Sequence, residues 1–288
     1  MKNLMLLATF AVAAATDAGS GEASQVPTGC KNFAFVSILK SGGRSVTKHF
    51  GKAGTPEETF LNQLRLPCGA CGNMHEVTAQ NQVNDIGATS WDSAHTFAVI
   101  RNPYDWIANL YFYEKVLCFM PHNPVLQIAA QTGTESYLCN MNDTQKSRPN
   151  EIIFREWLEV ADAQNNVRHT EFLLPNPAAF PIYWTSFPFG QYAWLSTATG
   201  LEISVNQLYK FEDIEAMNKI SNPGLLLREL CDYVPDFYDN SATSAFEHMH
   251  PLANSTVLYD ARSCEIVSRR LDADFRKFGY SKDCPSAV

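Results

Sequence analysis

The chain has 288 residues, of which 45% are hydrophobic and 12% aromatic, so it can bury a substantial core and is not a disordered polypeptide. Its formal net charge is −8, from 22 basic and 30 acidic side chains. This acidic balance argues against a nucleic-acid partner, whose binding depends on a basic surface. It does not exclude a local basic pocket that holds one phosphorylated ligand.

The first residues have the pattern of a secretory signal peptide. Lys2 is a short basic start, and residues 4–15 are an apolar run rich in Leu and Ala whose last three residues, 13–15, are small enough for a cleavage site. The run is shorter than the about 20 residues that span a membrane. We therefore expect residues 1–20 to be a signal peptide, or alternatively a short uncleaved anchor, with no stable membrane span after cleavage. Residues 28–284 are expected to form one domain that reaches the Golgi lumen or is secreted.

The cysteines agree with export. All eight lie beyond the predicted signal peptide, and an even number in that context is typical of disulfides. Cys68 and Cys71 form a CxxC pair, which also occurs in redox and zinc sites, but no second pair accompanies it. We expect a structural bridge there and no bound metal. The triplets that begin at Asn142 and Asn254 are acceptor sequences for N-glycosylation.

Strand-like and helix-like patterns alternate along the chain. Apolar runs predict buried strands over residues 33–39, 96–100 and 207–211. Helices are expected from Asp105 onward, over residues 152–163, and over one long C-terminal stretch that ends near Gly279. This alternation predicts an α/β fold with a parallel sheet covered by helices on both faces. Ligands of such sheets bind at the carboxyl ends of the strands.

The segment after the first predicted strand combines groups that can bind an anion. It contains Lys40, Ser41, Gly42, Gly43, Arg44 and Ser45, and a helix is expected to open at the last of these. Glycines let backbone N–H groups approach an anion, and a helix N-terminus favours negative charge. The Walker pattern is absent because the lysine precedes the glycines, which disfavours a nucleotide kinase or triphosphatase. An ordinary glycine turn with an exposed lysine is the alternative.

Arg101 occupies a similar place after the second predicted strand. Its guanidinium can hold an anion through two hydrogen bonds, and Asn109, about two helical turns further on, can donate to the same group. The alternative for Arg101 is a salt bridge to Asp105 or another surface acid. Two anion sites at neighbouring strand ends suit a ligand with two separated phosphates.

These segments resemble motifs of the Golgi-type carbohydrate sulfotransferase family. Residues 35–45 are similar to its 5′-phosphosulfate loop, and residues 97–106 to its 3′-phosphate motif. Residues 208–214 are similar to its strand-then-ED segment, and residues 271–280 to its D-F-x-x-F-G-Y ending. Two positions depart from the family pattern: Asn109 replaces a serine, and Arg44 replaces a threonine of the loop.

The resemblance implies a P-loop-like sulfotransferase fold and transfer of a sulfuryl group from 3′-phosphoadenosine 5′-phosphosulfate (PAPS) to a hydroxyl, with carbohydrate as the expected acceptor. Residues 40–45, Arg101 and Asn109 would bind PAPS, and Lys40 would stabilise the leaving oxygen. His75 is the candidate base, with Glu76 as the fallback, and the alternative is that His75 is a loop or core histidine without a catalytic role. A second hypothesis is a secreted binding protein on the same fold without catalytic activity.

Overall fold

The structure is a computed structural model. It describes residues 29–38, 40–43, 46, 55–66, 79–119, 137–168, 190–196, 202–203, 205–232 and 257–285. The predicted signal peptide, the helix start expected at Ser45, the CxxC pair and His75 lie outside these described residues.

A three-stranded parallel sheet forms the centre of the described fold. Its strands are β1 (Phe33–Val36), β2 (His95–Ile100) and β3 (Gln207–Lys210), in the order β1-β2-β3. The predicted α/β architecture with a parallel sheet is confirmed. The first and third strands are shorter than predicted: β1 ends two residues before Ile38, which is no longer in the ladder, and the chain turns directly after β3, at Phe211. Because all pairs are parallel, the carboxyl ends of the three strands meet at one edge.

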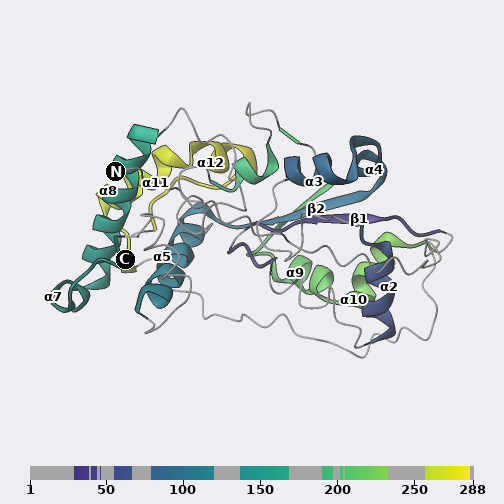
Figure 1. The fold of residues 1–288 in the computed structure, drawn as a ribbon, viewed down its shortest axis with the longest axis horizontal. Helices are drawn as coiled ribbons and strands as arrows, with labels where there is room; N and C mark the ends of the chain where they lie inside the picture. Colours follow the sequence, from purple (N-terminus) through teal and green to yellow (C-terminus); the bar gives the residue numbers. More distant parts are fainter. Residues whose placement is uncertain are drawn as a thin grey trace, which may run out of the picture.

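Helices cover both faces of the sheet (Figure 1). On one face, Phe33 and Phe35 pack with α2 (Pro56–Leu64), α9 (Ile214–Ser221) and α10 (Pro223–Leu230). On the other face, Ala34 and Val36 pack with α3 (Ala79–Ile86), α4 (Ala88–Ser93) and the 3-10 helix η3 (Tyr192–Leu195). Every residue of β1 is buried, which explains why this strand is a continuous apolar run instead of an alternating one.

A second group of helices packs beyond the carboxyl ends of the strands, on the left of Figure 1. It consists of α5 (Pro103–Phe119), α7 (Asp143–Lys146), α8 (Asn150–Arg168), α11 (Ala261–Arg270) and α12 (Asp272–Phe278). Aromatic side chains dominate the core between them, and Tyr111 of α5 lies against Phe154 and Trp157 of α8. The apolar spacing that predicted α8 is confirmed, since Phe154, Trp157 and Leu158 are all buried.

The single long C-terminal helix was a wrong prediction. The structure has two helices, α11 and α12, which meet at Leu271 with φ −103° and ψ 27°. Leu271 is buried in the core of this helix group, and Asp272 and Asp274 in the first turn of α12 favour a new helix start. The predicted end is confirmed, because Gly279 caps α12 in the left-handed conformation with φ 66°.

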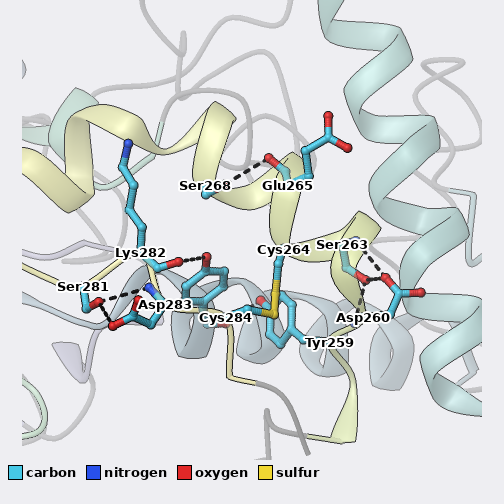
Figure 2. Close-up of a disulfide and its surroundings, with 11 residues drawn as sticks. Tyr259, Asp260, Ser263, Cys264, Glu265, Ser268, Ser281, Lys282, Asp283 and Cys284 are labelled. Carbon is cyan, nitrogen blue, oxygen red and sulfur yellow. Dashed lines mark hydrogen bonds between the residues drawn. A yellow bond between two sulfur atoms is a disulfide. The ribbon is translucent and has the colours of Figure 1, made fainter.

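All six described cysteines are paired, as Cys30–Cys231, Cys118–Cys139 and Cys264–Cys284. The last bridge ties α11 to the C-terminal segment, as Figure 2 shows. Next to it, the Tyr104 hydroxyl donates to the carbonyl oxygen of Lys282, so the tail is also fixed to α5. Disulfides in this number fit a secreted or lumenal protein. Within the described part of the chain, no helix has the length and apolarity to cross a bilayer.

Candidate functional site

The loop after β1 packs tightly against the ends of the other strands. A Cβ on Gly42 would lie 2.6 Å from a ring carbon of Phe211, the residue after β3. A Cβ on Gly43 would lie 2.5 Å from Ser37 Oγ, and Gly42 also has a φ of 93°. Gly42 therefore requires glycine for both conformation and close approach, whereas a side chain at Gly43 would require the Ser37 hydroxyl to rotate away. The conformation of this loop is therefore set by close packing, unlike that of an ordinary exposed turn.

Lys40 is held in an unusual conformation in this loop. Its φ is 61°, and it is the one described residue other than glycine with a positive φ. Its ammonium nitrogen lies 3.0 Å from the centre of the Tyr113 ring on α5, in a cation–π contact. Lys40 is half-buried, so it is not the exposed lysine of the alternative interpretation, and anion binding by this turn stays a prediction. Strained residues of this kind are concentrated at functional sites.

Arg101 directly follows β2 and is only 5% exposed. Its guanidinium carbon lies 4.3 Å from the centre of the Phe211 ring. Its Nε is buried without a hydrogen-bond partner, and within the described residues its side chain forms no salt bridge, with Asp105 or with any other acid. Burial lowers the pKa of Arg101, while the negative charges of Asp105 and Glu212 act from a distance to raise it. A buried cation without a directly bound counter-charge is energetically costly.

One glutamine side chain joins the loop after β1 to the end of β2. Gln191 Oε1 accepts a hydrogen bond from the Ser41 hydroxyl at 2.9 Å and another from the Arg101 backbone N–H at 2.8 Å. Gln191 Nε2 donates to the Arg101 carbonyl oxygen at 2.6 Å. Ser41 and Gln191 are both fully buried. The Ser41 hydroxyl, a predicted anion donor, therefore already has a protein acceptor.

A buried carboxyl group holds the backbone of Gln191 in place. The two carboxyl oxygens of Asp274, on α12, accept from the backbone N–H groups of Gln191 at 2.7 Å and Tyr192 at 2.8 Å. Gly190 has a φ of 67°, and a Cβ there would lie 2.7 Å from Asp274 Oδ1. Burial raises the pKa of Asp274 to about 7, against the pull of these donors. Gln191 and Asp274 are site residues that were not predicted from the sequence.

Glu212, after β3, is occupied by two other donors. Its carboxylate accepts from the Asn102 backbone N–H at 2.6 Å and from the Tyr280 hydroxyl at 2.8 Å. Burial raises the pKa of Tyr280, and the charge of Glu212 raises it further. The Lys210 ammonium lies 4.5 Å from the centre of the Tyr280 ring. These contacts give Glu212 a structural role at the start of α5 and leave the Arg101 guanidinium without a carboxylate ligand.

Asn109 lies on α5 and is half-buried. Its Nδ2 donates to the Asp105 carbonyl oxygen at 2.8 Å, one turn earlier in the same helix. One of its two amide hydrogens is therefore used within the helix, and the other remains available to a ligand.

The structure brings five predicted residues together at the carboxyl edge of the sheet: Lys40, Ser41, Gly42, Gly43 and Arg101. Arg44, Ser45, His75 and Glu76 lie outside the described residues, so their predicted roles stay predictions. His95 begins β2 at the opposite edge, where burial lowers its pKa and its Nε2 lies 3.9 Å from Glu229. Within the described residues, no group of three or more His, Cys, Asp or Glu side chains is arranged to hold a metal.

The chain has no significant match to any model of a known protein family, to any curated protein or to any solved structure.

Proposed function

We propose that this chain is a PAPS-dependent sulfotransferase of the secretory pathway, with a P-loop-like sulfotransferase fold and a hydroxyl, expected on carbohydrate, as acceptor. The observation that carries the proposal is Arg101, a buried guanidinium with an unpartnered Nε at the carboxyl edge of a parallel sheet. A bound anion would supply the missing counter-charge and hydrogen-bond acceptor, so the residues at this edge fit a phosphate or sulfate group.

The neighbouring strand end offers a second anion site. Lys40 brings an ammonium group to the loop after β1, and that loop is bonded to Arg101 through Gln191. Two basic groups on adjacent strands suit a nucleotide that carries anions at both its 5′ and 3′ positions. The resemblance assigns the 5′-phosphosulfate to the Lys40 loop and the 3′-phosphate to Arg101.

The proposed reaction is an in-line displacement at sulfur. The acceptor oxygen forms a new bond to sulfur while the bond between sulfur and the 5′-phosphate oxygen breaks, and the hydroxyl proton passes to a base. Lys40 stabilises the negative charge that develops on the leaving oxygen, an electrostatic role that strengthens in the transition state. His75 is the proposed base, with Glu76 as the alternative.

A transfer assay with sulfur-labelled PAPS tests the proposal. The acceptors are glycans, sterols, tyrosine peptides and small phenols, and Lys40→Ala serves as the matched inactive variant. Transfer to at least one acceptor, lost in the variant, is the expected result. Binding of adenosine 3′,5′-bisphosphate without transfer to any acceptor would favour the non-catalytic binding protein instead.

A further inference from the structure

We propose that Gln191 is a positioning residue that sets the separation of the two anion sites, so that the protein selects nucleotides with two anionic groups over nucleotides with one. This proposal rests on the proposed function, because it takes the Lys40 loop and Arg101 as the two halves of one nucleotide site.

Gln191 is placed to control that separation because its amide contacts both halves at once. Its Oε1 holds the Ser41 hydroxyl of the loop, while Oε1 and Nε2 together hold the N–H and C=O of Arg101. These partners lie 150 and 90 positions from Gln191 in the sequence. Apart from packing and the sheet itself, this amide is the direct polar link between the two strand ends in the described residues.

The amide has one orientation that satisfies its neighbours. The oxygen faces two donors and the nitrogen faces a carbonyl, so a flipped amide would place hydrogens against hydrogens. A carboxylate at this position would face the Arg101 carbonyl oxygen with an oxygen of its own. Glutamate is therefore nearly isosteric with Gln191 yet cannot make the same set of bonds.

The backbone of Gln191 is also prevented from moving. Asp274 accepts from its N–H and from that of Tyr192, and Gly190 allows the close approach of the chain to this carboxyl group. The Phe211 ring in turn contacts the Arg101 guanidinium, and Gly42 packs against the same ring. Buried groups with defined hydrogen-bond or packing partners thus connect α12 to both anion sites.

A ligand with one anionic group needs only one of the two sites, so its affinity is insensitive to their separation. A ligand with two anionic groups gains the second interaction only if both sites are already at the right distance. Loosening the Gln191 link should therefore lower the affinity for the ligand with two anionic groups selectively. A residue with a merely structural role would weaken all ligands alike, through loss of folded protein.

The test is calorimetric titration of wild type and Gln191→Leu with adenosine 3′,5′-bisphosphate, adenosine 5′-monophosphate and adenosine 3′-monophosphate. We expect the variant to lose roughly tenfold or more in bisphosphate affinity, the scale of one buried hydrogen bond, and about twofold or less for each monophosphate. Gln82→Leu is the matched control. Gln82 is also a buried glutamine whose Nε2 donates to a backbone carbonyl, that of Phe35, so its loss should lower stability without changing the ratio of affinities.

Two further variants keep the test decisive if Gln191→Leu does not fold. Gln191→Glu and Asp274→Asn preserve side-chain size and should reduce the ratio of bisphosphate to monophosphate affinity in the same direction. Equal weakening of all three nucleotides, or an unchanged ratio, would overturn the role of Gln191 while the nucleotide assignment stands. If folded wild type binds none of the nucleotides, the proposed function itself is wrong and this inference falls with it.

Discussion

The guanidinium carbon of Arg101 lies over the ring of Phe211, 4.3 Å from the ring centre. Phe211 also lies so close to Gly42 that no side chain fits at that position. Phe211 itself follows β3, and its ring thus contacts residues that follow both other strands. It holds Arg101 through its π face and supplies no counter-charge, which leaves the arginine ready for an anionic ligand.

Arg101→Met should abolish tight nucleotide binding without lowering stability. A buried charge without a directly bound counter-charge is replaced by an apolar chain of similar length, so the free energy of unfolding should stay unchanged or rise by about 1 kcal/mol or more. Urea unfolding at neutral pH measures this change in the free energy of unfolding. Arg270→Met is the control, because the Arg270 side chain is similarly buried but paired with Asp162, so its loss removes one of the two arginines bound to this carboxylate and should lower the free energy of unfolding. Equal destabilisation by the two variants would show that the native fold needs the charge of Arg101.

The sequence was sufficient to predict the strands, the parallel sheet and the position of Arg101 at a strand end. These follow from short-range patterns: an apolar run, then a turn, then a helix. Gln191 and Asp274 could not be predicted in the same way. Gln191 meets Ser41 across 150 positions and Asp274 across 83, and neither segment has a local pattern that reports such a contact. The break at Leu271 was missed because the apolar spacing continues unchanged through it.

Lys40→Ala should lower kcat by roughly 100-fold or more, while bisphosphate affinity falls less. A positive charge at the leaving oxygen stabilises the transition state more than the bound donor, and loss of one preorganised group costs on this scale. Steady-state transfer kinetics and calorimetry together measure the two effects. Lys219→Ala is the control, since Lys219 pairs with Glu229 on the α9–α10 face and should not affect turnover. Unchanged kcat in Lys40→Ala would remove this lysine from the mechanism.

Asp274 should make the protein less stable as the pH rises toward neutrality. Burial raises the pKa of this carboxyl group to about 7 from an ordinary 3.8, so the folded state binds the proton more tightly than the unfolded state. Its contribution to the free energy of unfolding is therefore fully present below the unfolded pKa and is lost as the pH rises through the folded value. Urea unfolding of wild type and Asp274→Asn, from about pH 4 to about pH 8, isolates this contribution. Wild type should lose more stability than the variant over that range, and parallel curves would contradict the raised pKa.

Asn142 should carry an N-linked glycan when the protein is expressed in the secretory pathway. It is exposed, begins an acceptor triplet, and caps α7 by accepting from the Gln145 N–H through Oδ1 at 2.9 Å. Glycosylation uses the amide nitrogen, so the cap survives the modification. Removal of N-glycans by an endoglycosidase should increase electrophoretic mobility. In Asn142→Gln this mobility shift should be smaller by the contribution of one glycan. Asn150→Gln, an exposed asparagine outside any acceptor triplet, should change nothing. No difference between wild type and Asn142→Gln would argue against modification of this site.

The most direct test of the proposed site is calorimetric titration of the oxidised, folded protein with adenosine 3′,5′-bisphosphate in the presence of EDTA. Arg101 and the Lys40 loop supply positive charge from the protein itself, so we predict saturable binding at one site without a divalent metal, lost in Arg101→Met. Absence of any saturable heat from folded wild-type protein would contradict the assignment of this strand edge as a nucleotide site.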